Sequence, residues 1–270
     1  MSYQAIAFDL DGTLLTSQGT ILESSKQAIQ RARDLGLKVF IVTGRHHTAV
    51  RPYYHQLNLD TPVVCCNGTY LYDFHNDEVL SGKPLTTEQA NFLVKSAQDL
   101  GIHVALYTRD SMTYEWLNPH FTKLLKWVES CDEAVRPSVL QANFADLLDG
   151  NTLIWKVLIS DPDLEKMQNF VENLPLVEYS AEWSWVDRVD ITAQGNSKGA
   201  CLLELLQREQ LDPARVIAFG DNFNDISMLS AVGLGIAMGG SEAEVQQSAK
   251  RTIGSNNEDS IAQTLNALLG

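Results

Sequence analysis

The stretch that decides the fold is Tyr3-Gln4-Ala5-Ile6-Ala7-Phe8, followed directly by Asp9-Leu10-Asp11-Gly12-Thr13. A short, nearly continuous apolar run is typical of a buried strand. The run ends abruptly in a polar turn that contains glycine, which marks the point where the strand stops. The stretch therefore predicts a buried strand whose carboxyl end carries two acidic groups.

Alternating strands and helices continue outward from this strand. A helix fits residues 25–35, with Ser24 or Ser25 as its cap and Gly36 just beyond its end. Apolar strands that alternate with helices favour a parallel sheet covered on both faces. The further strands and helices expected in this sheet are strands over 38–42, 63–66, 215–219 and 234–238 and helices over 197–207, 225–231 and 260–269. The fold class is therefore α/β, with a Rossmann-like, three-layer core.

The middle of the chain follows a different pattern, which begins near Pro84. Its expected elements are helices opening at Thr86 or Thr87 and at Asp163, and strands over 104–108, 112–116, 153–160, 177–180 and 183–189. The stretch from about 117 to Gly150 is polar and predicts irregular structure. Several strands with two helices between them indicate an α+β module inserted into the first domain. We place the core domain at residues 1–83 and 190–270 and the inserted domain at 84–189.

Composition excludes several classes of protein. The 270 residues include 20 basic and 34 acidic side chains, so the net charge is −14, which argues against a nucleic-acid partner. Hydrophobic residues make up 44%, enough for a core. No apolar run approaches the roughly 20 residues of a membrane helix, and no leader pattern follows Met1. Four cysteines fit reduced core thiols. We expect a soluble, cytoplasmic protein without a membrane partner, either a monomer or a small homo-oligomer.

Charged and small polar residues gather at the predicted strand exits. The carboxyl ends of parallel strands meet at one crevice, so residues far apart in sequence converge there. Facing carboxylates repel one another unless a cation lies among them, and oxygen ligands favour Mg²⁺. A lysine and backbone N–H groups beside glycines would hold a phosphate. A single aspartate at a strand end is usually a turn or cap residue, and a threonine there can cap a helix; the combination is what points to chemistry. The residues in question are Asp9, Asp11, Thr43, Lys198, Asp221 and Asp225.

Four ordered motifs carry a resemblance to a known family. They are Asp9-Leu10-Asp11-Gly12-Thr13, Val42-Thr43-Gly44-Arg45, Asn196-Ser197-Lys198-Gly199 and Gly220-Asp221-Asn222-Phe223-Asn224-Asp225. In this order, with an insertion between the second and the third, they resemble the haloacid dehalogenase superfamily. Within it, the chain is similar to the Cof-type phosphatases, which carry a large α/β cap of the C2B type. The resemblance covers essentially the whole chain.

The resemblance implies a phosphatase with an aspartyl-phosphate intermediate. Asp9 would be the nucleophile and Asp11 the general acid and base. Mg²⁺ would be the cofactor, held by the Asp9 carboxylate, the Asp11 carbonyl and Asp221. Asp225 would reach the metal through water or only orient Lys198 or Asp221. The phosphoryl oxygens would be bound by the Leu10 amide, Thr43, the Gly44 amide, Lys198 and Asn224.

Substrate recognition would lie with the cap and is less defined. Trp183 and Trp185 lie two residues apart on a predicted strand, so both project from one face, either into the cap core or as a wall for a planar ring. Arg45 either contacts substrate or pairs with a surface carboxylate. His46 and His47 fit ordinary loop histidines. The cap would open and close through hinges near 83–84 and 189–192 and would admit only small phosphorylated metabolites.

Two stretches narrow the expected substrate. Glu182-Trp183-Ser184-Trp185 and the run from Cys65 to Asp73 look like the bacterial Cof-type pyridoxal phosphate phosphatases. This resemblance makes pyridoxal 5′-phosphate the first expected substrate, with sugar phosphates and other small monoesters as alternatives. A phosphotransferase or mutase on the same fold and a phospho-receiver signalling domain stay open as other functions.

Overall fold

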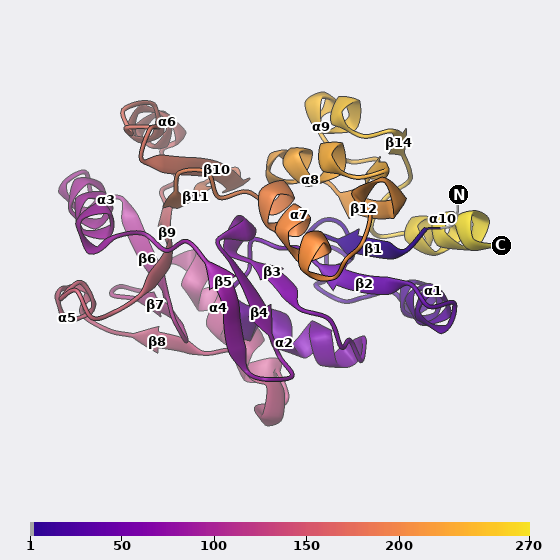
Figure 1. The fold of residues 1–270 in the computed structure, drawn as a ribbon. Helices are drawn as coiled ribbons and strands as arrows, with labels where there is room; N and C mark the ends of the chain where they lie inside the picture. The colour runs from indigo at the N-terminus through magenta and orange to yellow at the C-terminus, as the bar shows by residue number, and fades with distance from the viewer. Residues whose placement is uncertain (1–2) are drawn as a thin grey trace. The chain divides into compact units, whose positions relative to one another are not determined.

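The computed structural model describes residues 3–270, which pack as two compact units (Figure 1). The core unit comprises residues 3–44, 56–81 and 197–270. The insert unit comprises residues 45–55 and 82–196. The roles of catalytic core for residues 1–83 with 190–270 and of cap for 84–189 stay a prediction. No helix among the described residues has the length and apolar composition needed to cross a membrane.

The core unit is built on a five-stranded parallel sheet, as predicted. Its order is β14-β13-β12-β1-β2, with bounds Arg251–Thr252, Leu234–Ala237, Val216–Gly220, Ala5–Phe8 and Lys38–Ile41. Phe8 lies between Phe219 and Ile41 in the register, so the three central strands end at the same edge. The strands are almost wholly buried because helices cover both faces.

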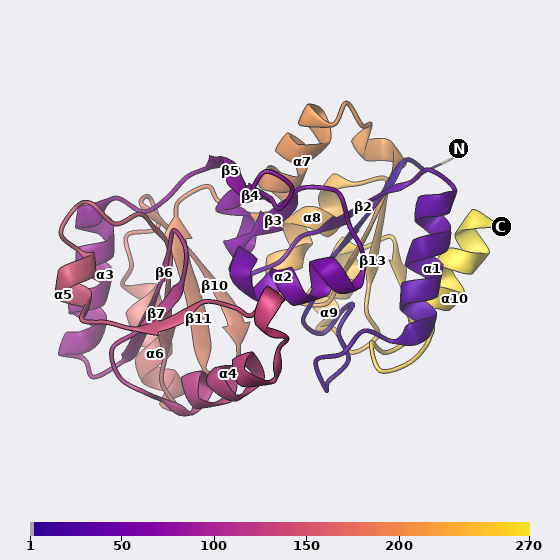
Figure 2. The same ribbon diagram turned by 90° about the horizontal axis from the view of Figure 1, so that it is seen from below.

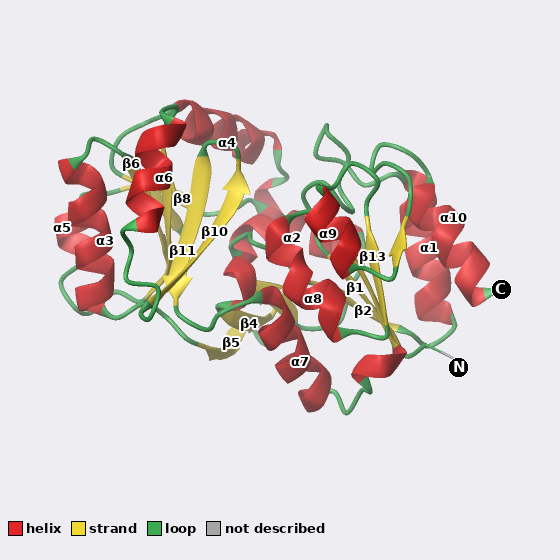
Figure 3. Cartoon of the chain, turned by 90° about the horizontal axis from the view of Figure 1, so that it is seen from above, coloured by secondary structure: helices red, strands yellow, loops and turns green. Residues whose placement is uncertain are grey.

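Helices α7 and α8 cover one face of this sheet, while α1 and α10 cover the other (Figures 2 and 3). The helix bounds in the core unit are α1 Glu23–Asp34, α7 Lys198–Arg208, α8 Ile226–Ala231, α9 Ala243–Ser248 and α10 Ser260–Leu269. A smaller sheet, β3-β4-β5, has the bounds Val63–Cys65, Tyr70–Asp73 and Glu78–Gly82. A parallel bridge between Val42 and Val64 places β3 beside the end of β2. The predicted α/β fold class is confirmed.

The predicted cap of α1 is wrong. The helix begins at Glu23, and its N-cap, Leu22, offers no side-chain acceptor. Ser24 instead donates a hydrogen bond to Asp259, 2.5 Å between the oxygens, and Ser25 is buried. Packing of the apolar face of α1, rather than a polar cap, therefore sets where this helix starts.

The insert unit is a six-stranded sheet with helices packed on one face. The order is β10-β11-β9-β6-β7-β8, with bounds Tyr179–Trp185, Arg188–Ala193, Ile154–Ser160, His103–Thr108, Met112–Tyr114 and Val139–Gln141. Helices α3 (Thr87–Asp99) and α6 (Leu164–Glu172) bury their apolar stripes against it. Thr86 and Gln89 form a capping box on α3, and Asp163 caps α6, as their sequence positions predicted.

Residues 117–150 are more regular than predicted. They contain α4 (Pro119–Ser130), β8 and the short helix α5 (Phe144–Leu147). The start of α4 has a readable signal, because the Asn118 side chain accepts a hydrogen bond from the Phe121 amide and Pro119 occupies the first helical position. The polar surface of α4 hid this helix from a pattern based on apolar residues.

The strands at the end of the insert also differ from the prediction. One hairpin, β10 and β11, replaces the two short strands expected over 177–180 and 183–189. The expected hinge at 189–192 lies inside β11, which is hydrogen-bonded to β10 on one side and β9 on the other. A strand paired on both edges cannot absorb a hinge rotation without losing those bonds, so that hinge prediction is wrong.

His46 and His47 do not lie in a loop. His47 is the first residue of α2 (His47–Gln56), and both rings are buried. The His46 Nδ1 atom accepts from the Thr48 amide, 3.3 Å, and its Nε2 atom lies 3.0 Å from the Thr108 carbonyl oxygen. This arrangement fits a neutral ring with its proton on Nε2. Burial lowers the pKa of His46 to about 4.

We predict that His46 makes the insert unit less stable at mildly acidic pH. Its folded pKa lies below the ordinary value, so only the unfolded chain takes up a proton as the pH falls from 7.5 to 5. The free energy of unfolding should drop by about 2 kcal/mol from this residue. Urea unfolding at both pH values should show this drop in the wild type and its loss in His46→Asn, whereas equal pH slopes would contradict it.

Candidate active site

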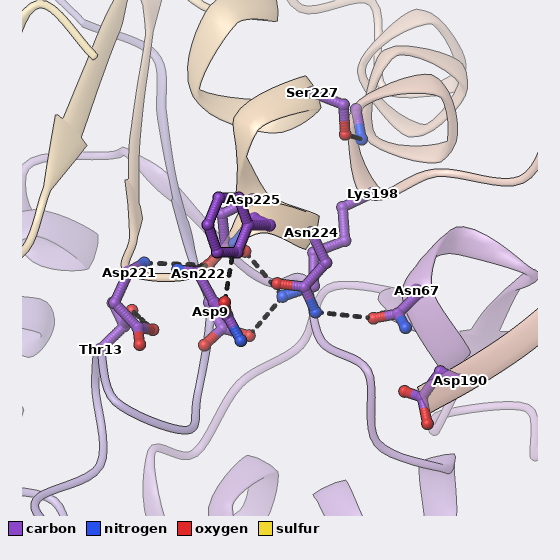
Figure 4. Close-up of polar contacts among 12 residues, drawn as sticks. Asp9, Thr13, Asn67, Asp190, Lys198, Asp221, Asn222, Asn224, Asp225 and Ser227 are labelled. Atoms are coloured by element: carbon purple, nitrogen blue, oxygen red, sulfur yellow. Dashed lines mark hydrogen bonds and ion pairs between the residues drawn. The ribbon is translucent and has the colours of Figure 1, made fainter. Parts of the chain in front are cut away.

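The strand exits of the core unit bring four predicted site residues together (Figure 4). The Lys198 Nζ atom lies 2.7 Å from Asp9 Oδ1 and 2.6 Å from Asp225 Oδ1. Asp221 follows β12 on the neighbouring strand, as Asp9 follows β1. Lys198, Asp9 and Asp225 are each buried. An ammonium group at this depth between two carboxylates is far from the usual surface position of a lysine.

Backbone geometry places each of these side chains. The Asp9 amide donates to the Phe219 carbonyl, 3.0 Å, so Asp9 prolongs the parallel ladder between β1 and β12. Lys198 opens α7, whose cap is the Ser197 hydroxyl accepting from the Ala200 amide. Local rules of strand ends and helix caps therefore aim both charges at the same edge of the sheet.

Asp225 has both carboxylate oxygens engaged by protein groups. Its Oδ1 accepts from Lys198, and its Oδ2 accepts from the backbone amides of Asp221 and Asn222 at 2.9 and 3.1 Å. These contacts tie the turn after β12 to the lysine. They favour the orienting role over the metal-contacting role among the two considered from the sequence.

The acidic cluster fits a divalent cation. One carboxylate oxygen from each of Asp9, Asp221 and Asp225 lies within 4.8 Å of the others. Burial raises the pKa of Asp9, against the lowering effect of Lys198, and the nearby carboxylates raise it further. Burial and the charge of Asp225 raise the pKa of Asp221 to about 7. Carboxylates that resist ionisation in one another's company gain most from a cation, and an all-oxygen set suits Mg²⁺.

Gly12 is required by the close approach of its turn to Asp221. It has a φ of +84°, and a Cβ atom there would lie 2.2 Å from Asp221 Oδ2. The neighbouring Thr13 hydroxyl donates to Asp221 Oδ1, 2.7 Å. The two acidic turns, after β1 and after β12, are therefore packed directly on each other. Asp11 lies in the first turn with an exposed side chain, and Leu10 is buried.

The predicted phosphate-binding residues surround the lysine. Thr43 is buried and its amide donates to the Val64 carbonyl, 2.9 Å, with Gly44 next in the chain. The Asn224 Nδ2 group donates to Asn67 Oδ1, 3.1 Å. Our sequence analysis did not place Asn67 in the site. The available signal was an Asn-Gly pair directly after a buried strand, which marks a turn that favours positive φ.

The two tryptophans do not share a face of the sheet, so that prediction is wrong. A β-bulge separates them, with Trp183 opposite Val189 and Trp185 opposite Arg188. One extra residue in a strand inverts the alternation of side chains beyond it. Trp183 therefore packs against the apolar core of the insert unit, while Trp185 is 61% exposed with the Arg188 guanidinium 5.6 Å from its ring centre.

Arg45 lies against aromatic rings of the insert unit. Its guanidinium carbon is 5.1 Å from the ring centres of both Tyr53 and Trp127, which stack on each other. These contacts restrict the side chain of Arg45 by cation–π attraction. Neither of the two roles considered for Arg45 is decided by them.

The comparisons with known proteins agree with this architecture. Residues 6–265 match the family model of the haloacid dehalogenase-like hydrolases. The chain is 43% identical over 265 residues to the pyridoxal phosphate phosphatase YbhA of Escherichia coli, with 97% of both chains covered. It is 29% identical to the 5-amino-6-(5-phospho-D-ribitylamino)uracil phosphatase YitU of Bacillus subtilis, with 96% of this chain and 95% of that one covered. Among solved structures, a haloacid dehalogenase-like hydrolase from Bacteroides thetaiotaomicron has a TM-score of 0.85 at 23% identity, covering 99% of this chain and 100% of that one.

The chain therefore belongs to the haloacid dehalogenase-like hydrolase family. The predicted enzyme class, a phosphatase, is confirmed by this membership and by the relative at 43% identity. The structural likeness extends the match to the whole fold, insert included.

We predict that Gly12→Ala lowers phosphatase activity far more than it lowers stability. Both Gly12 and Gly36 have a φ near +85°, so alanine at either position should cost about 1 kcal/mol of unfolding free energy. No described atom lies within 4 Å of a Cβ at Gly36, whereas the one at Gly12 displaces Asp221. Assays of both variants should show loss of activity only for Gly12→Ala; equal activities would contradict the close packing of the two turns.

Proposed function

We propose that the protein is a Mg²⁺-dependent phosphomonoesterase that forms a covalent phosphoryl intermediate on Asp9. The observation that carries the proposal is the buried contact between the Asp9 carboxylate and Lys198, beside Asp221 at the carboxyl edge of the sheet. Burial opposes ionisation of Asp9, and the lysine charge counteracts this effect. A carboxylate kept ionised in a desolvated position is a competent nucleophile.

The proposed reaction has two displacement steps. The Asp9 carboxylate attacks phosphorus, and the bond to the leaving oxygen breaks as Asp11 gives that oxygen a proton. Asp11 then takes a proton from a water molecule that attacks the phosphoryl group and restores Asp9, releasing inorganic phosphate. The exposed position of Asp11 suits both tasks, since it reaches solvent as well as the turn that carries Asp9.

The Asp9 carboxylate, the Asp11 carbonyl and Asp221 would hold Mg²⁺, with Asp225 as the group that orients Lys198 and the turn of Asp221. When bound, Mg²⁺ supplies positive charge that reduces the repulsion between nucleophile and phosphate. The Leu10 and Gly44 amides, Thr43, Lys198 and Asn224 would bind the phosphoryl oxygens. Phosphoryl transfer depends mainly on such positioning and charge stabilisation.

We infer that the insert unit is the cap that selects the leaving group and that the substrate is pyridoxal 5′-phosphate. The support is the similarity to the Escherichia coli pyridoxal phosphate phosphatase along 97% of both chains. Another relative acts on a phosphorylated ribitylaminouracil, so small phosphomonoesters with planar rings are the class we propose. Arg45 and the exposed Trp185 are the candidate contacts for such a ring.

We predict that Asp9→Asn reduces kcat by at least about a thousandfold, because an amide oxygen is a poor nucleophile. Hydrolysis of an aryl phosphate with Mg²⁺ measures the loss, and circular dichroism checks that the variant is folded. Asp34→Asn, on the exposed surface of α1, is the control and should keep full activity. Retained activity in Asp9→Asn would exclude Asp9 as the nucleophile.

We predict that pyridoxal 5′-phosphate is hydrolysed with a kcat/KM at least about tenfold above that of a hexose phosphate, a ratio that a few pocket contacts supply. Activity should vanish with EDTA and return with Mg²⁺. Analysis of products should show free phosphate; a phosphorylated second metabolite would indicate a phosphotransferase. Equal turnover of the two substrates would remove the support for the pyridoxal substrate.

A further inference from the structure

Three successive residues of the core unit have a left-handed backbone. Cys66, Asn67 and Gly68, between β3 and β4, have φ values of +48°, +57° and +84°. This conformation is unfavourable for residues with a Cβ, by roughly 1–2 kcal/mol each, although asparagine tolerates it better than most. Strained backbone persists only where surrounding contacts hold it, and it gathers at functional sites.

The turn is held to the motif that contains Thr43. The Asn67 amide donates to the Thr43 carbonyl, 3.0 Å, and the Thr69 hydroxyl closes the turn by donating to the Cys66 carbonyl, 2.7 Å. The position of Asn67 is therefore set relative to the first residue of the proposed phosphate-binding loop. The contact is a main-chain hydrogen bond, which any side chain at 67 would keep if the backbone stayed in place.

The same turn lies against the start of α7. A Cβ atom on Gly68 would lie 2.0 Å from the Ser197 carbonyl oxygen and 3.0 Å from the Lys198 amide nitrogen. Only glycine permits this approach. The turn therefore touches the residue that caps α7 and the backbone of Lys198.

A third contact joins the turn to Asn224. Asn67 is 2% exposed, and its Oδ1 accepts from Asn224 Nδ2, 3.1 Å (Figure 4). The Asn224 Oδ1 atom is buried without a hydrogen-bond partner among residues 3–270. The bond to Asn67 is thus the printed side-chain contact that orients this amide, and the second Nδ2 hydrogen is left for another acceptor.

We infer that Asn67 is a positioning residue of the phosphatase reaction. Its main-chain amide anchors the turn to Thr43, and its side chain orients Asn224 beside Lys198, so three separate phosphate-binding elements meet on one turn. The inference rests on the proposed phosphate-binding roles of Thr43, Lys198 and Asn224. Asn67 acts through Asn224 and does not itself touch the reacting atoms.

Orientation of a charge-binding group affects the transition state more than the bound substrate. A displacement of about 1 Å in such a group lowers rates by roughly a hundredfold. Loss of the Asn67 side chain should therefore lower kcat by about 10- to 100-fold with little change in KM. Inhibition by orthovanadate, which adopts a five-coordinate geometry in such sites, should weaken by a similar factor.

The variant that tests this is Asn67→Gly, because glycine keeps the left-handed backbone and removes only the side chain. Asn58→Gly is the matched control: Asn58 is an exposed residue of the core unit with a φ of +49°. Both changes should alter the unfolding temperature by similar, small amounts. Only Asn67→Gly should lower kcat; equal kcat values in the two variants would overturn the inference.

A double-mutant cycle separates positioning from a general structural role. If Asn67 acts through Asn224, Asn67→Gly combined with Asn224→Ala should be no slower than Asn224→Ala alone. Multiplying effects on kcat would show that the two residues act independently and would contradict the inference. Asp9→Asn, measured in parallel, reports on the proposed function: retained activity there rejects that function, whereas an inactive Asp9→Asn with a wild-type kcat in Asn67→Gly rejects only the role of Asn67.

Discussion

The buried ammonium group of Lys198 is the interaction on which the rest of the site depends. Burial disfavours its charge, but the Asp225 and Asp9 carboxylates raise the pKa of Lys198 above its ordinary value. One cation inside the core unit thus keeps two carboxylates in place and receives its own stabilisation from them. Removal of any member would leave a buried charge without its counterion, which is among the most destabilising changes in a protein.

This arrangement also explains how a strongly acidic chain presents a site suited to an anionic ligand. The net charge is −14, and Asp9, Asp221 and Asp225 add three carboxylates to one edge of the sheet. Lys198 and backbone amides reverse the local field, and the cluster of carboxylates gives a divalent cation a place to add to that reversal. The global charge therefore has little bearing on the local preference of the site.

Prediction from sequence worked best where structure is local. The parallel strands, the caps Thr86, Asp163 and Ser197, and the aspartates at the strand ends all follow from short patterns that the structure reproduces. The predictions failed where one residue changes a register or a polar surface hides a helix. The bulge between Trp183 and Trp185 sends Trp185 to the other face, and α4 has few buried residues to reveal its period.

The sequence by itself determined that the protein has a parallel α/β core, which ionisable groups lie at its strand exits and which family it resembles, because each depends on residues close together along the chain. Only the tertiary structure decided that Asp225 has both oxygens engaged, that Arg45 lies between two rings, and that Asn67 joins the elements of Thr43, Lys198 and Asn224. These contacts link residues up to 157 positions apart. Packing of whole elements creates them, and no local pattern records which partner a buried amide or carboxylate will meet.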